Sequence, residues 1–226
     1  MEIQNQLFTT EQNQLLSARK KLYQLLHQLL SEPISFERFI EIKEQGYIDG
    51  LIELDNSVQI LYDFFYCQDI DESIQKARED FFRLFIGPDS LPAPPWESVY
   101  RSKERALFDF PTFEVRNLYN QFGLEVRKRE NLHDEADDHI VFEIEFMIAL
   151  IEKTQKEEER DVIIKLLEGQ KMLLSEHLSK WVPQFSLDIR NNASTSLFIG
   201  IGYLLDFFTK FDCELVDDLF VSINNC

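Results

Sequence analysis

The run Glu135-Ala136-Asp137-Asp138-His139 places three carboxylates and a histidine within five residues. Such groups could work as an acid–base pair, as metal ligands, or as anchors for a cationic ligand. The apolar periodicity that follows predicts a helix beginning at Asp134, with these groups on its first turns. There the helix dipole favours the carboxylates and disfavours protonation of His139, while the carboxylates favour it. A structural role for this run therefore stays open beside a functional one.

Metal and nucleophile chemistry find little support in the sequence. A di-metal centre in a helical bundle needs Glu-x-x-His on two helices, yet Ala136 stands three residues before His139 and the only match ends at His133 in a polar stretch. The three cysteines have unrelated spacings and form no C-x-x-C pair, which also fits a reducing compartment. Nucleophile-elbow, P-loop and dinucleotide-binding motifs are absent. We therefore predict no catalytic residue, no metal ligand and no cofactor.

A second stretch with chemical potential is the proline-rich segment GPDSLPAPPWESVY, which covers residues 87–100. Its prolines fix the backbone near extended geometry, so this loop is expected to be rigid. Trp96 and Tyr100 would present flat amphipathic surfaces of the kind that proteins use to bind another chain. The alternative is a rigid connector whose tryptophan fills the core.

The composition predicts an all-α protein, a single-domain helical bundle over residues 1–226 with this rigid loop in it. The chain is 44% hydrophobic and has only seven glycines and seven prolines, so it can bury one sizeable core in long helices. The expected helices are 10–31, 35–46, one capped by Asn56, 71–85, 111–122, one from 134 to the charged run at 156, 161–180 and 190–211. Gly200 and Gly202 are expected to permit close helix packing.

The formal net charge of −18 argues against nucleic acid and anionic lipid surfaces as partners. The same charge would attract a cationic peptide, although it could serve solubility alone. The N-terminal residues show no secretory signal, and the most apolar tract, 196–208, is broken by Asp206 and too short to span a bilayer. We therefore expect a cytoplasmic protein without stable membrane insertion.

Two stretches together carry a resemblance to a known family. Residues 82–88, FRLFIGP, lead into LPAPPWESVY, and Glu135-x-x-Asp138-His139 precedes an apolar helical face that includes Phe146 and Met147. In both, the chain resembles the TorD/DmsD/NarJ family of redox-enzyme maturation chaperones, and it is most similar to the DmsD-like and TorD-like members. The resemblance covers nearly the whole chain. One position at which this chain departs from the family pattern is Ala136, where the family often has proline.

The resemblance implies a cytoplasmic chaperone, not an enzyme. Such a protein would bind the twin-arginine signal peptide of a molybdopterin-dependent oxidoreductase subunit, similar to DMSO or TMAO reductase, and proofread its maturation before Tat export. It also implies a groove for this leader peptide, with an apolar wall, polar contacts and a polar floor. Carried onto this sequence, the peptide-binding residues are Pro94, Pro95 and Trp96 (wall), Glu97 and Tyr100 (contacts), Asp138 and His139 (floor), and Glu135.

The chemical groups of such a leader peptide suit the groove that the resemblance implies. Carboxylates pair with the two guanidinium groups of the leader, and an apolar groove buries its hydrophobic segment. The resemblance also suggests the Tat translocase as a further partner and guanine nucleotide as a ligand, although the sequence has no phosphate-binding loop. Two alternatives stay open. One is a small-molecule or nucleotide-hydrolysing enzyme that uses His139 and its neighbouring carboxylates, and the other is a NarJ-like chaperone with a client that is not exported.

Overall fold

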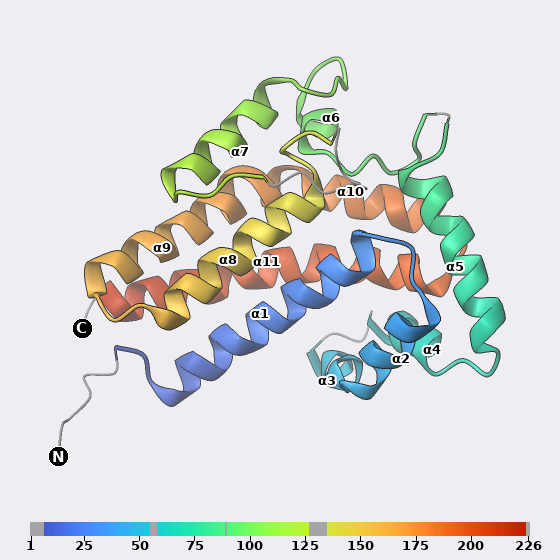
Figure 1. Ribbon diagram of the computed structural model, residues 1–226, viewed down its shortest axis with the longest axis horizontal. Helices are drawn as coiled ribbons and strands as arrows, with labels where there is room; N and C mark the ends of the chain where they lie inside the picture. The colour runs from blue at the N-terminus through green and yellow to red at the C-terminus, as the bar shows by residue number, and fades with distance from the viewer. Residues whose placement is uncertain (1–6, 55–57, 89, 127–134, 225–226) are drawn as a thin grey trace.

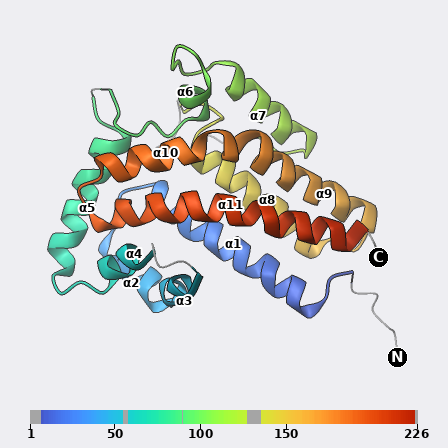
Figure 2. The same ribbon diagram turned by 180° about the vertical axis from the view of Figure 1, so that it is seen from behind.

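The computed structural model describes residues 7–54, 58–88, 90–126 and 135–224. Long helices lie side by side and form the body of the molecule, as Figures 1 and 2 show from opposite sides. These helices are α1 (Thr10–Leu30), α8 (Ile140–Lys156), α9 (Arg160–Met172), the π-helix η2 (Leu173–Leu178), α10 (Ser179–Asn192) and α11 (Ser196–Asn224). The expectation of an all-α helical bundle is confirmed, and within the described ranges the β-type pairing is a single isolated bridge.

The other helices lie at one end of this body and along one edge (Figure 1). At the end lie α2 (Phe36–Glu44), α3 (Tyr47–Leu54), α4 (Gln59–Phe65) and α5 (Ile70–Phe85), and along the edge lie α6 (Glu97–Arg101) and α7 (Phe110–Gln121). One cluster of buried apolar side chains runs through the whole assembly, and its largest members include Trp181, Phe185 and Phe198. In the part of the chain that the structure describes, no helix is both long and apolar enough to cross a bilayer.

The close approach of α11 to its neighbours depends on glycine, as expected. A Cβ atom on Gly200 would lie 2.7 Å from the Cβ of Leu61 and 2.8 Å from its Cα, because α4 packs directly against this face. A Cβ atom on Gly202 would lie 2.9 Å from the carbonyl oxygen of Ser186 on α10. Larger residues would force these helices apart.

The local start and stop signals are mostly where the sequence predicts them. Ser35 caps α2 through its hydroxyl, Gly46 follows that helix at a φ of 66°, and Pro111 stands in the first turn of α7. The predicted cap of α5 at Asp71 is wrong, because Asp69 accepts a hydrogen bond from the backbone N–H of Glu72 at 3.1 Å. The predicted cap at Asn56 lies outside the described residues.

The C-terminal third departs from the prediction in a way that the packing explains. Instead of separate helices over 161–180 and 190–211, a helical segment runs from Arg160 to Asn192 and α11 begins only at Ser196. Asp80 on α5 is buried and accepts hydrogen bonds from the backbone N–H groups of Ser194 at 2.9 Å and Thr195 at 3.0 Å. This remote carboxylate satisfies the free N–H groups at the start of α11 and so fixes the break after α10.

Candidate functional site

The proline-rich loop is ordered by packing against the end of α5. The N–H of Ala93 donates to the carbonyl of Leu84 at 3.4 Å, and the side chains of Ala93 and Pro95 are buried. Pro94 is partly exposed. The loop therefore holds Trp96, which is also partly exposed, in a fixed position at its end.

Backbone hydrogen bonds join this loop to the acidic run, so the structure brings together the two stretches that the sequence singles out. The N–H of Glu97 donates to the carbonyl of Asp138 at 3.0 Å, and the N–H of Ile140 donates to the carbonyl of Pro95 at 2.9 Å. Trp96 and His139 thereby form the isolated antiparallel bridge. The two segments make one wall although they are about forty residues apart.

The Asp138 carboxylate is fully buried and connects three elements. It accepts hydrogen bonds from the backbone N–H of Ser98 at 2.6 Å and from the hydroxyl of Thr112 at 2.8 Å. The first bond satisfies a free N–H in the opening turn of α6, a helix that the sequence does not predict, and the second joins α7. Asp138 holds the wall in shape through these bonds.

The Glu97 carboxylate is also fully buried. One of its oxygens accepts from Arg101 at 2.6 Å, and the other lies 2.9 Å from Nδ1 of His177 on the π-helix η2. The ring of Tyr100 packs against that of Trp181 at a centroid distance of 5.6 Å, and burial raises the pKa of its hydroxyl. Glu97 and Tyr100 thus anchor α6 to the bundle.

The long helix α8 begins later than the sequence predicts, directly after His139. The expected first residue, Asp134, lies outside the described residues, and α8 begins at Ile140 with His139 as its N-cap in extended geometry. The backbone is extended here because its hydrogen bonds go to the proline loop. The acidic run therefore precedes the helix and does not lie on its first turns.

The side chain of His139 is held neutral. Its Nδ1 accepts a hydrogen bond from the N–H of Val141 at 3.2 Å, which requires an unprotonated Nδ1. Burial lowers the pKa of His139 to about 3. Its ring meets that of Trp96 edge to face at 5.6 Å. At neutral pH His139 therefore presents an uncharged ring.

Trp96 and Glu135 form the exposed part of the wall. The indole N–H of Trp96 donates to the Glu135 carboxylate at 2.9 Å, and both side chains are partly exposed. This bond fixes the orientation of the indole and places a carboxylate at the edge of its ring.

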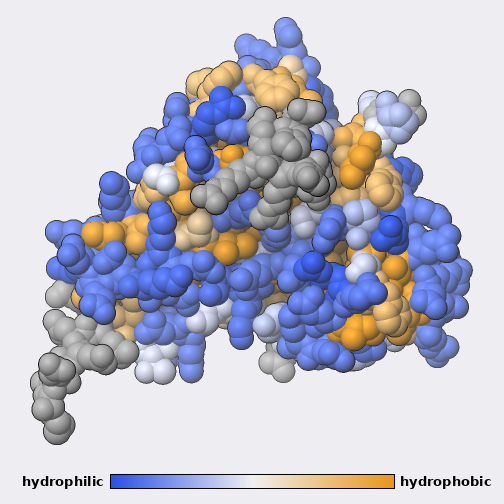
Figure 3. Space-filling model, in the orientation of Figure 1, coloured by the Kyte–Doolittle hydropathy of each residue, from blue (hydrophilic) through white to orange (hydrophobic). Residues whose placement is uncertain are grey.

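A groove of about 460 Å³ lies against this wall. Its lining combines the loop, the end of α1, the end of α5 and the start of α8, and includes Leu30, Glu32, Pro33, Phe81, Phe82, Phe85, Ile86, Leu91, Pro95, Trp96, Glu135, His139 and Ile140. Apolar side chains gather on the surface at the upper end of α5 (Figure 3), where Phe82 and Ile86 are 46% and 56% exposed. The carboxylates of Glu32 and Glu135 lie among these apolar side chains.

Four of the predicted peptide-binding residues line this groove: Pro95, Trp96, Glu135 and His139. The other four, Pro94, Glu97, Tyr100 and Asp138, lie outside its lining, and both buried carboxylates among them are committed to internal hydrogen bonds. Sequence reasoning missed Glu32, Phe82 and Ile86. For the last two a signal existed, since Phe82 and Ile86 are bulky apolar residues in the last turn before Gly87-Pro88, where the helix cannot continue.

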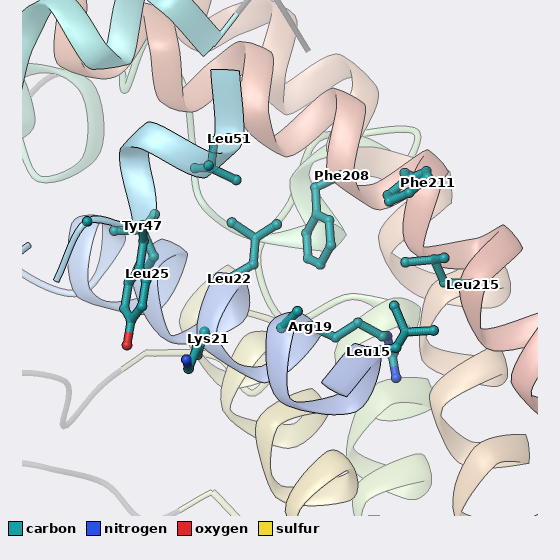
Figure 4. A pocket seen from close by; sticks show the side chains of 13 residues that line it. Leu15, Arg19, Lys21, Leu22, Leu25, Tyr47, Leu51, Phe208, Phe211 and Leu215 are labelled. Carbon is teal, nitrogen blue, oxygen red and sulfur yellow. The ribbon is translucent and has the colours of Figure 1, made fainter. Parts of the chain in front are cut away.

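A second cavity, of about 440 Å³, lies between α1, α3 and α11 (Figure 4). Leucine and aromatic side chains line most of it, among them Leu22, Leu51 and Phe208. The guanidinium of Arg19, which also lines it, forms a buried ion pair with Asp212. This cavity suits an apolar group.

The linings of the two cavities differ in charge. The described lining of the groove carries carboxylates and no lysine or arginine, whereas the second cavity is largely apolar but includes Lys21 and the ion-paired Arg19. Among the described residues, no group of three or more His, Cys, Asp or Glu side chains is arranged to hold a metal ion.

Comparison with known proteins places the chain in a family. Residues 53–186 match the model of the nitrate reductase delta subunit family, and the chain belongs to this family, which includes the TorD, DmsD and NarJ proteins. It is 25% identical to the chaperone protein TorD of Vibrio parahaemolyticus over 201 residues, which cover 86% of this chain and 92% of the relative. It is 24% identical to the TorD of Aliivibrio fischeri, over 88% of this chain and 94% of the relative.

A third relative is the Tat proofreading chaperone DmsD of Salmonella typhi, which is 29% identical over 134 residues, 59% of this chain and 57% of the relative. These relatives confirm the resemblance that the sequence shows, and they confirm a chaperone in place of an enzyme. The alternative of a hydrolase that uses His139 gains no support from them.

Proposed function

We propose that this protein is a cytoplasmic chaperone for the twin-arginine signal peptide of a molybdopterin-dependent oxidoreductase subunit. It would bind the leader while the client matures and release it for Tat export. The observation that carries the proposal is the groove beside Trp96, which combines apolar walls with carboxylates. The names of its relatives, the TorD chaperones and the Tat proofreading chaperone DmsD, support the same role.

The groove suits the chemistry of such a leader. The aromatic side chains of α5 and the face of Trp96 can bury an apolar peptide segment, and Glu135 and Glu32 can pair with guanidinium groups. Because backbone hydrogen bonds fix the wall before a peptide arrives, the protein backbone loses little conformational freedom there on binding.

The proposal is tested by calorimetric titration with a synthetic twin-arginine leader from a molybdoenzyme of the same genome, beside a Lys-Lys version and a scrambled peptide. Trp96→Ala should weaken binding by about 1–3 kcal/mol if this residue is a central anchor. Phe110→Ala is the matched control, because this aromatic side chain is 63% exposed on α7 and lies outside the groove. Failure of every candidate leader to bind the folded protein would refute the proposed function.

A further inference from the structure

The groove contains an ion pair that bears on how a leader would be recognised. Glu32, in the segment between α1 and α2, lines the groove, and its carboxylate accepts a hydrogen bond from the guanidinium of Arg38 at 3.2 Å. Glu32 is 52% exposed and Arg38 30% exposed. Exposed pairs of this kind contribute at most about 1 kcal/mol, so another cation can displace Arg38 easily.

Arg38 offers the same chemical group that an arginine of the leader would bring. Its backbone is fixed in the first turn of α2, where its N–H donates to the hydroxyl of Ser35 at 3.2 Å, while its long side chain keeps rotational freedom. Its Nε also lies 3.9 Å from the carboxylate of Glu41, one turn further along the helix. Glu41 itself lies outside the lining of the groove, so it offers a carboxylate beside the same arginine that a ligand in the groove does not meet.

The rest of the described groove favours a cation at this position. Its lining includes the carboxylates of Glu32 and Glu135 and no lysine or arginine side chain. His139 adds no positive charge, because burial keeps its ring neutral. A guanidinium entering the groove thus meets negative charge next to the apolar surface of Pro33 and Phe82.

We propose that Glu32 is an arginine-binding carboxylate of the groove and that Arg38 occupies it until a leader guanidinium replaces it. This inference rests on the proposed function and assigns the leader's arginine a specific partner. Arg38 acts as an internal competitor: it keeps Glu32 paired in the empty protein and selects for ligands whose cation pairs better than its own. A bidentate guanidinium meets that requirement, and an ammonium does not.

The test measures leader affinity in three single variants. Glu32→Gln should weaken binding of the Arg-Arg leader about fivefold to tenfold, because a charge-assisted hydrogen bond is lost. Glu41→Gln is the matched control: it removes the same charge beside the same arginine, but Glu41 lies outside the groove, and affinity should change less than about twofold. Arg38→Gln should tighten binding about twofold to fivefold, because the competitor is gone.

A double variant separates competition from general electrostatics. If Arg38 acts by occupying Glu32, Arg38→Gln gives no gain in the Glu32→Gln background, whereas a change in net charge alone would give the same gain in both backgrounds. All these residues are at least partly exposed, and unchanged thermal unfolding would confirm that each variant folds.

Two results would overturn the inference. If the wild-type protein binds the leader and Glu32→Gln and Glu41→Gln reduce affinity equally, Glu32 has no special role and the proposed function still stands. If the wild-type protein binds no leader, the proposed function and this inference fail together.

Discussion

Acidification should destabilise this protein through His139, and His139→Asn should remove that component. Burial lowers the pKa of His139 to about 3 in the folded protein, whereas the pKa in an unfolded chain is about 6.5. Below that higher value the unfolded chain binds a proton that the folded protein excludes, so the free energy of unfolding falls as the pH drops. At about pH 5 the difference amounts to about 2 kcal/mol relative to about pH 7.5.

Asparagine is the matched replacement because it keeps the cap without titrating. Its side-chain oxygen can accept the hydrogen bond that the N–H of Val141 donates to Nδ1 of His139 at 3.2 Å. Other buried groups also titrate, and Glu143 does so with the opposite sign, since burial raises its pKa. Because both proteins keep Glu143, the difference between them isolates His139.

The measurement is urea unfolding of both proteins at a series of pH values and constant ionic strength. The advantage of the wild type over His139→Asn should shrink by about 2 kcal/mol between about pH 7.5 and about pH 5. A difference that stays constant within about 0.5 kcal/mol over this range would show that His139 is not held neutral as the cap of α8.

Three further predictions test the packing and the buried charges. Gly200→Ala should lower the free energy of unfolding by about 1–3 kcal/mol. Gly50→Ala should raise it by about 0.5–1 kcal/mol, because a Cβ atom at Gly50 would meet nothing within 4 Å. Equal denaturation midpoints for the two variants would contradict this prediction. Asp212→Asn should destabilise by about 3–5 kcal/mol because it leaves Arg19 buried without its counter-charge. The pair Arg19→Met/Asp212→Leu should recover part of that loss, because it removes the unpaired charge but leaves the hydroxyl of Tyr23 and the amide oxygen of Gln170 without these partners. A double variant less stable than the single one would count against the argument. Burial raises the pKa of Glu143 in the folded protein. Above about pH 4.3 the unfolded chain therefore releases a proton that the folded protein keeps, and the free energy of unfolding of the wild type falls by up to about 1.4 kcal/mol per pH unit. Glu143→Gln should abolish this slope in a pH series of urea unfolding, and an unchanged slope would refute the assignment.

The sequence predicts those parts of the fold that depend on neighbouring residues. Ser35 and Pro111 mark helix starts through local geometry, and the apolar face of α1 follows from its leucine spacing. Apart from the cap of α5, which lies two residues from its predicted place, the errors occur where a distant group decides. The start of α8 and the existence of α6 depend on hydrogen bonds between the proline loop and the acidic run, and the break before α11 depends on Asp80.

The candidate site divides in the same way. Trp96 and the acidic run stand out in the sequence because their residue types are unusual for a helical protein. Glu32 carries no such mark: it is one of forty-one acidic residues, and it belongs to the groove only because the fold brings the chain after α1 and the end of α5 to the same lining. The buried roles of Glu97 and Asp138 are likewise invisible until their partners are known.

The wall of the groove is joined by main-chain atoms, and this bears on how such a protein could acquire a new client. The two hydrogen bonds between residues 95–97 and 138–140 use only backbone N–H and carbonyl groups. Substitutions at Trp96 or Glu135 therefore alter the surface that faces a ligand without removing the bonds that hold the two segments together. For a groove that binds leaders as proposed above, changes on this surface would alter the preference among leaders while these backbone bonds stay in place. Duplicated copies of such a chaperone could thus diverge in specificity while the frame of the wall stays the same.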